Sequence, residues 1–246
     1  DQLETTGQQS RAYAILGVLG HAYVWGNGAG APTEAGANNH LPKCIAEPWV
    51  KISEKLGVPP VATYAGLCLW NWNFLIKPAH EDPASWELDD FINNIKTINT
   101  FSGSTDESWF YIVSVFFEYR AAPCIPLGLN ILQACRENNT NQVIELLQEF
   151  AERIDELGTL LLKMEELCDP HVFYFKLRPY LAGWKNMKDA GLPEEGVYYG
   201  DEKKPRVLSG GSNAQSSFVQ FMDLILNVNH TSTGEKKNGS NENPFM

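Results

Sequence analysis

Apolar residues recur at helical spacing along nearly the whole chain, and convincing alternation with a period of two is absent. The pattern therefore predicts an all-α fold. The expected helices span residues 4–25, 43–57, 59–75, 86–98, 106–121, 126–137, 140–168, 170–187 and 213–229.

The clearest of these helices is 140–168. Its apolar positions form two interleaved seven-residue series, which are Val143, Phe150, Leu157, Met164 and Leu147, Ile154, Leu161, Cys168. Such a stripe packs against neighbouring helices at a shallow angle. Asp169 and Pro170 follow it, and they predict a helix stop and a new start, with Asp169 as N-cap and Pro170 in the first turn.

Two long connections, 26–42 and 186–212, are rich in residues that favour loops. Loops of this length are more often functional or mobile than passive. Residues 230–246 are polar with little to bury, which predicts disorder. We therefore expect one helical domain over 1–229 and a disordered tail over 230–246. The chain begins at Asp1 without an initiator Met, ahead of a helical stretch, and reads as an excised piece.

Composition narrows the function classes. Over 246 residues the formal charge is -11 and the pI is about 4.9, which argues against nucleic-acid binding. An odd number of cysteines, five, without a CxxC pair favours neither a disulfide framework nor a zinc site, and it suits the reducing cytoplasm. No apolar run approaches the roughly 18 residues of a membrane span, and no signal peptide is evident.

Two segments carry candidate chemistry. Residues 173–185 place Arg178 in an aromatic, apolar helix, where a permanent charge predicts an anionic partner. In 209–217 the pair Gly210 and Gly211 lets the backbone approach a ligand, and hydroxyl and amide side chains follow. Together they predict a pocket for a flat, apolar, carboxylated ligand.

Plainer interpretations stay open for both segments. Arg178 could form a structural salt bridge. The glycines could be a flexible helix entry in which Ser212 caps a helix starting near Asn213. A nucleotide-binding loop is rejected, because the Lys-Ser/Thr of a P-loop is missing and no strand precedes the glycines.

Several segments together resemble the indoleamine 2,3-dioxygenase family of haem enzymes. Besides the two above, they are HAYVWG at 21–26, LPKCIA at 41–46, KLGVPP at 55–60, Tyr64-Ala65 and Asn71-Trp72. They occur in the family's order and at roughly its spacings, across nearly the whole chain. The resemblance implies a multi-helix haem-binding bundle.

The resemblance also assigns site residues, none of them as an acid or base. It implies that the substrate is bound by Tyr64, Phe110, Ser114, Phe173, Arg178 and Ser212. It implies that haem is contacted by Leu67, Cys68, Ser114, Leu181, Gly210, Gly211, Ser212 and Asn213. From the residues alone, Phe110 and Tyr64 could equally be core aromatics, and Ser114 could bond back to the preceding turn.

Three departures from the family pattern stand out. Asn213 occupies a position where the family commonly has a small residue. Pro179 directly follows Arg178, which predicts a kink and disfavours helical geometry at the Arg. The segment that holds the family's proximal iron-binding His matches none of His21, His40, His80, His171 and His230. Residues 242–246 resemble the approach to that segment, so the iron ligand is expected beyond Met246.

The resemblance implies a dioxygenase that uses haem b to insert O2 across the indole C2–C3 bond of L-tryptophan, giving N-formylkynurenine. This would be the first step of the kynurenine pathway. Its partners would be L-tryptophan and O2, with no nucleic acid and no membrane, and the protein would be a cytoplasmic monomer. The alternatives are a haem-binding oxygen carrier or weakly active paralogue, and a non-catalytic helical interaction module.

Overall fold

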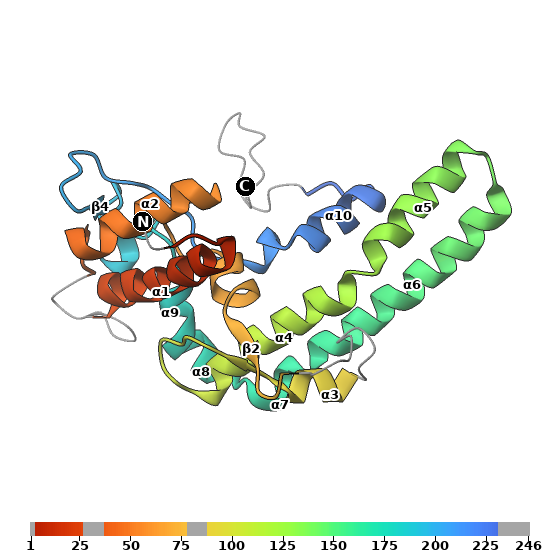
Figure 1. Cartoon of the computed structure of the whole chain (residues 1–246), viewed down its shortest axis with the longest axis horizontal. Helices are drawn as coiled ribbons and strands as arrows, with labels where there is room; N and C mark the ends of the chain where they lie inside the picture. The colour runs from red at the N-terminus through yellow and green to blue at the C-terminus, as the bar shows by residue number, and fades with distance from the viewer. Residues whose placement is uncertain (1–2, 27–36, 78–87, 231–246) are drawn as a thin grey trace. The chain divides into compact units, whose positions relative to one another are not determined.

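A computed structural model describes residues 3–26, 37–77 and 88–230. The described chain is predominantly helical with a few short strands, which confirms the all-α class (Figure 1). It divides into two compact units, Asp1–Phe117 with Leu160–Ser212, and Glu118–Thr159 with Asn213–Met246. The predicted disordered tail, apart from His230, lies outside the described residues, as does most of the predicted loop 26–42.

Among its described residues, the first unit contains three long helices, the last of them only in part, and a set of short elements. Its first part comprises α1 (Thr6–Trp25), β1 (His40–Leu41), α2 (Lys43–Leu56), the π-helix η1 (Ala65–Leu69), β2 (Trp72–Phe74), α3 (Leu88–Asn93), β3 (Ile95–Thr97) and most of α4 (Thr105–Ala121). Its second part comprises α7 (Met164–Leu167), α8 (Pro170–Val172), the π-helix η3 (Phe173–Leu177), α9 (Arg178–Leu181), the 3-10 helix η4 (Lys188–Ala190) and β4 (Tyr198–Tyr199). Helix α1 packs against α2, and β1 pairs in parallel with β4.

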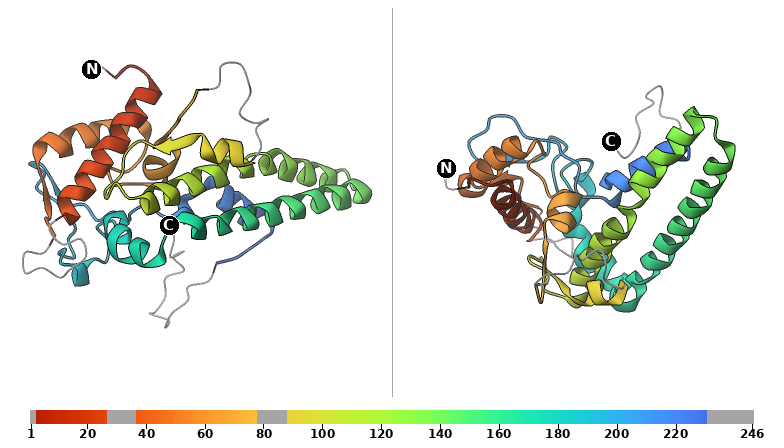
Figure 2. Two further views of the ribbon diagram at one scale, coloured as in Figure 1. Left: turned by 90° about the horizontal axis from the view of Figure 1, so that it is seen from below. Right: turned by 45° about the vertical axis from the view of Figure 1, so that its right-hand side comes forward.

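The second unit is built on α5 (Cys124–Arg136) and α6 (Thr140–Leu162). These helices run side by side as an antiparallel hairpin joined by a short turn, as all the views show (Figures 1 and 2). The 3-10 helix η5 (Asn213–Gln215) leads into α10 (Ser217–Ile225), which packs on α5. Gly128 makes that packing possible, because a Cβ there would lie 2.8 Å from the ring of Phe221.

The predicted helix 59–75 is wrong for most of its length, and 86–98 is too long. Residues 72–74 and 95–97 instead pair as the antiparallel strands β2 and β3, with Phe74 opposite Ile95. The side chain of Asn94 fixes this pairing by bonding to both the N–H and the carbonyl of Ile76, each at 2.9 Å. These non-local bonds override a pattern that locally favours helix.

The predicted helices 140–168 and 170–187 are each broken into shorter pieces. Helix α6 ends at Leu162 and α7 resumes after a turn at Lys163. The Asp169 cap is confirmed, because its carboxylate accepts from the N–H groups of His171 and Val172. The second helix ends at Leu181 rather than 187. Helix α10 starts at Ser217 and is capped by Ser216, so Ser212 is not its cap.

One continuous stretch, Thr105–Arg136, is long and apolar enough to cross a membrane by length and composition alone. The prediction that no run of this kind exists is therefore wrong. The stretch spans two helices, α4 and α5, and 56% of its most apolar window is buried inside the protein. Buried core helices pass the same test, so this is weak evidence for a membrane span.

The core of the first unit is aromatic and is organised around a buried histidine on α1. Trp49 of α2 and Trp184 are fully buried, and both rings lie against the imidazole of His21. The imidazole is itself fully buried and uses both nitrogens. Nε2 accepts the Ala62 N–H at 2.8 Å, so Nδ1 carries the proton and donates to the Tyr180 carbonyl at 2.7 Å.

Two tyrosine hydroxyls hold the same loop that His21 holds. The hydroxyl of Tyr13 lies 2.8 Å from the Pro59 carbonyl and 2.6 Å from that of Val61. The hydroxyl of Tyr199 donates to the Pro60 carbonyl and accepts from the Trp184 indole N–H at 2.8 Å. The proline-rich segment 59–63 is thus fixed from three sides, and it leads directly into η1.

The first prediction concerns acid stability. Burial lowers the pKa of His21 to about 4, whereas an unfolded histidine titrates near 6.5. The unfolded state therefore binds more protons between these values, and stability falls as the pH drops. Through His21 alone, the free energy of unfolding should fall by about 1.4 kcal/mol per pH unit between roughly pH 6.5 and 4.

Urea unfolding of the wild type and of His21→Gln over pH 4–8 measures this contribution. Gln cannot titrate, so the variant should be less stable at pH 7.5 and should lose less stability on acidification. Parallel pH profiles for the two proteins would show that His21 does not carry the effect.

Candidate functional site

Two π-helical turns carry residues that the sequence assigns to the pocket. In the first, η1, the Trp70 N–H donates to the Ala65 carbonyl at 2.9 Å, five residues back. Leu67 and Cys68 of this turn are buried, as is Tyr64 just before it. Single π-turns inside helical segments occur frequently at functional sites.

The second π-turn, η3, explains how the chain accommodates Pro179. Because Pro179 has no N–H, an α-helical ladder would lose a bond there. The chain widens instead, and the Arg178 N–H donates to the Phe173 carbonyl five residues back. Arg178 retains right-handed helical angles, with φ −49° and ψ −38°. The expectation that Pro179 disfavours helical geometry at Arg178 is therefore wrong.

The structure brings two of the predicted substrate residues together. The rings of Phe110, on α4, and Phe173, on η3, lie 4.8 Å apart at 42°. Both side chains are half-buried, so each retains surface for a ligand. Ser114 follows one turn along α4, where it is buried and its hydroxyl donates to the Phe110 carbonyl at 3.0 Å. The back-bonded geometry that the sequence left open for Ser114 is present.

Arg178 is exposed rather than buried, which contradicts the expectation of a cation sunk among rings. Its guanidinium lies 4.9 Å from the centre of the Tyr174 ring, a cation–π contact. No carboxylate of the described residues forms an ion pair with it, so the structural salt bridge is not found within that part of the chain. The guanidinium remains available to an anionic ligand.

The Gly210–Gly211 pair packs against the protein's own backbone. A Cβ on Gly210 would overlap the Leu181 carbonyl oxygen and the Gly183 nitrogen. A Cβ on Gly211 would lie 2.8 Å from Leu67 Cδ1. Because the glycines have no side chain, this loop can contact the end of α9 through Gly210 and η1 through Gly211. The loop, η1 and α9 therefore lie in one region of the first unit.

The other assigned residues occupy less enclosed positions. Leu181 is half-buried at the end of α9, and Ser212 is exposed at the end of the glycine loop. Asn213 is exposed and begins η5 in the second unit.

The described histidines occupy separate positions and do not form a metal centre. His21 uses both nitrogens within the core. His40 stacks on Tyr198 and bonds to Asn39, His230 bonds to Asp223, and His171 lies on the exposed side of α8. Within residues 3–26, 37–77 and 88–230, no three His, Cys, Asp or Glu side chains are grouped to hold a metal. His80 and the segment 242–246 lie outside the described residues.

Sequence reasoning missed Glu107, a fully buried carboxylate in the first turn of α4. The missed signal was Ser104-x-x-Glu107, the pattern of a helix capping box. Ser104 accepts the Glu107 N–H at 3.1 Å, as the motif requires. The role of His21 was also missed, although its segment was part of the family resemblance.

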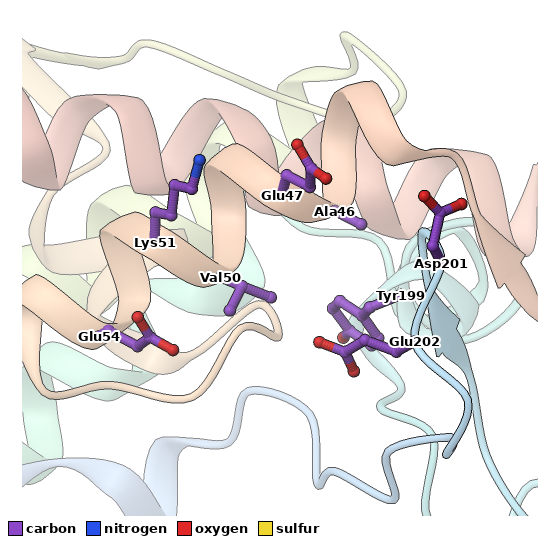
Figure 3. Close-up of a pocket in the computed structure, with 8 residues that line it drawn as sticks. All are labelled: Ala46, Glu47, Val50, Lys51, Glu54, Tyr199, Asp201 and Glu202. Carbon is purple, nitrogen blue, oxygen red and sulfur yellow. The ribbon is translucent and has the colours of Figure 1, made fainter. Parts of the chain in front are cut away.

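A pocket of about 420 Å³ lies elsewhere in the first unit, between α2 and the turn after β4 (Figure 3). Its lining is Ala46, Glu47, Val50, Lys51, Glu54, Tyr199, Asp201 and Glu202. Asp201 pairs with Lys43, and Glu202 pairs with Arg206. None of the predicted site residues lines this pocket.

The described chain is thus predominantly helical and carries an aromatic pair, an exposed arginine and a tightly packed glycine loop. Comparison with known proteins gives the family. The model of the indoleamine 2,3-dioxygenase family matches residues 1–246, so the chain belongs to that family.

Individual relatives support the assignment. The chain is 47% identical over 223 residues to indoleamine 2,3-dioxygenase from Saccharomyces cerevisiae, covering 90% of this chain and 47% of the relative. It is 36% identical over 234 residues to indoleamine 2,3-dioxygenase nanC from Aspergillus nanangensis, covering 93% and 54%. It is 32% identical over 235 residues to 6-hydroxytryptophan 2,3-dioxygenase fscD from Fusarium equiseti, covering 94% and 53%. The chain thus spans about half the length of these relatives.

The second prediction tests the glycine loop. Gly210→Ala should destabilise the protein by about 1–3 kcal/mol, because its Cβ meets rigid backbone. Gly211→Ala should cost less, since Leu67 Cδ1 is a side-chain end that can move. The measurement is the free energy of unfolding in urea.

Gly7→Ala is the matched control. Gly7 is exposed in α1 with nothing within 4 Å of an added Cβ, so Ala there should be neutral or stabilising by up to about 1 kcal/mol. Equal stability of the Gly210 and Gly7 variants would contradict the close approach.

Proposed function

We propose that this chain forms the substrate-binding part of a haem-dependent dioxygenase that converts L-tryptophan and O2 to N-formylkynurenine. The observation that carries the proposal is the Phe110–Phe173 pair with the exposed Arg178 on the turn that follows Phe173. The pair offers aromatic faces to an indole, and the guanidinium offers a fork of donors to a carboxylate. Family membership adds the reaction class.

The residues present suit one side of a haem. The buried side chains of Leu67 and Cys68 and the half-buried ring of Phe110 are apolar surfaces of the kind that flank a macrocycle. These residues, with Ser114, Leu181 and the loop 210–212, would hold the group. These residues include no histidine that could bind the iron, and His21 is committed to the core by both nitrogens. When bound, the haem would supply the activation of O2.

The protein's own task is then to bind and orient the substrate. Phe110, Phe173 and the buried Tyr64 would hold the indole ring, and Arg178 would fix the carboxylate. The Gly210–Ser212 loop would cover the ammonium side. Ser114 has its proton engaged by the Phe110 carbonyl, so we assign it a packing role and no proton transfer.

The substrate preference is set by what touches the indole ring. Relatives are named for indoleamines and for 6-hydroxytryptophan. The aromatic pair described here is apolar, which favours an unsubstituted indole over a hydroxylated one. None of the five cysteines, all of which lie in the described residues, forms a disulfide, in keeping with a reducing compartment, so we propose a cytoplasmic enzyme.

The third prediction concerns Arg178. In the complete haem-loaded enzyme, Arg178→Ala should raise KM for L-tryptophan about 10- to 150-fold, the equivalent of one charge-assisted hydrogen-bonded pair. Haem affinity should change far less, because Arg178 is assigned to the substrate. The measurements are steady-state kinetics and a haem titration.

Arg178→Lys is the matched variant, and tryptamine, which lacks the carboxylate, is the matched ligand. Lys keeps the charge without the bidentate fork, so it should recover only part of the affinity. The inhibition constant of tryptamine should not respond to either change. Equal losses of tryptophan and haem affinity in Arg178→Ala would refute the assigned role.

The fourth prediction concerns Ser114. Because its hydroxyl is bonded within the helix, Ser114→Ala should leave kcat within about threefold of the wild type, well below the contribution of a general acid or base. A loss of 100-fold or more in kcat, with haem content unchanged, would show that this hydroxyl takes part in proton transfer.

A further inference from the structure

Glu107 is a buried carboxylate that the proposed reaction does not use. It is fully buried, and its hydrogen-bond donors among the described residues are all neutral. Oε1 accepts the Phe101 N–H at 2.7 Å and the Tyr111 hydroxyl at 3.1 Å. Oε2 accepts the Ser102 N–H at 2.7 Å and the Ser102 hydroxyl at 2.6 Å. Four donors converge on one carboxylate.

These bonds fasten the 101–102 backbone to the start of α4. In an ordinary capping box the Glu bonds to the N-cap N–H, here that of Ser104. In this protein that N–H bonds to the Ser102 hydroxyl instead, and the Glu reaches further back along the chain. The carboxylate therefore does more than cap a helix, because it fixes the loop that precedes the helix.

The loop in turn contacts the helix that carries the substrate-binding arginine. The ring of Phe101 stacks on that of Tyr180, with centroids 5.0 Å apart and planes within 10°. Tyr180 lies two residues after Arg178 in α9, and its carbonyl accepts from His21. Phe101 and His21 thus hold the same residue of α9, one through its ring and the other through its backbone.

We propose that Glu107 is a positioning residue that sets the place of Arg178 relative to the aromatic pair. Phe110 lies one turn after Glu107 on α4, and Arg178 is reached through Phe101 and Tyr180. Glu107 therefore links the two halves of the substrate site, the ring-binding half and the carboxylate-binding half. This inference rests on the proposed function, because Arg178 matters only if it binds the substrate.

This role requires that both oxygens of Glu107 accept hydrogen bonds. A Gln side chain has the same shape, but its NH2 group is itself a donor and would face two of the four donors. A buried N–H or hydroxyl would then lack an acceptor, which is unfavourable enough to release the loop. Phe101 would lose its fixed position against Tyr180, and the guanidinium two residues earlier would lose its alignment.

The test uses Glu107→Gln in the complete haem-loaded enzyme. KM for L-tryptophan should rise about 5- to 20-fold, less than for removal of the arginine itself. The inhibition constant of tryptamine, which has no carboxylate, should stay within about twofold, and so should kcat per bound haem. A merely structural role would lower the amount of active enzyme and would leave both binding constants unchanged.

A double-mutant cycle with Phe101→Leu tests the path. That variant removes the ring stack and keeps the backbone bonds to Glu107, so it should show the same selectivity for the carboxylate substrate. If both residues act through Tyr180, the two effects should not add. The KM of the double variant for L-tryptophan should then be at most about twofold higher than that of the single variant with the higher KM. Multiplicative losses would overturn the shared path.

Amide hydrogen exchange separates failure of this inference from failure of the proposed function. Glu107→Gln should speed exchange at residues 101–102 and at 178–184, whatever reaction the enzyme performs. Unchanged exchange at 178–184 would overturn the positioning role. Faster exchange together with an unchanged KM for L-tryptophan would overturn the link from Glu107 to substrate binding. The proposed function is tested separately, by the effect of Arg178→Ala on KM for L-tryptophan.

Discussion

The arrangement of the first unit depends on the two hydrogen bonds of the buried His21 imidazole. One bond holds Ala62, in the segment that leads into η1, and the other holds Tyr180, in the helix that carries Arg178. A neutral imidazole serves both because it has one donor and one acceptor on opposite sides of a rigid ring. Protonation would turn the acceptor into a second donor facing the Ala62 N–H. The neutral state is therefore part of the fold.

The described part of the first unit contains two π-helical turns, η1 and η3. The segments assigned to the proposed site, η1 and η3, depart from regular α-helix and still satisfy their backbone groups. In η1 the Leu67 carbonyl is bonded by the Asn71 side chain, and in η3 the Phe173 carbonyl accepts from Arg178. The glycine loop then packs against the Leu67 side chain of η1 and against the backbone at the end of α9. The proposed site is thus built on irregular turns whose backbone carbonyls are bonded within the first unit.

Local patterns predicted the long helices well, including α1, α2, α4 and the Asp169 cap, because amphipathic spacing and capping residues are local signals. They failed at 59–75 and 86–98, where the β2–β3 pairing brings Phe74 to Ile95, which are distant along the chain. Local patterns also could not predict that Arg178 is exposed, because a charged residue among aromatic ones can lie on either face of a wide turn. The Ser104–Glu107 pattern was readable, but its reach to residues 101–102 depends on the folded loop.

The most direct measurement is a haem titration of the complete natural chain, followed by Soret absorption, with assay of tryptophan-dependent product. We predict stoichiometric haem binding with a histidine-ligated spectrum and formation of N-formylkynurenine. Stoichiometric haem without product would contradict the dioxygenase assignment in favour of an oxygen carrier. Failure to bind haem at all would contradict the assignment of these residues to a haem site.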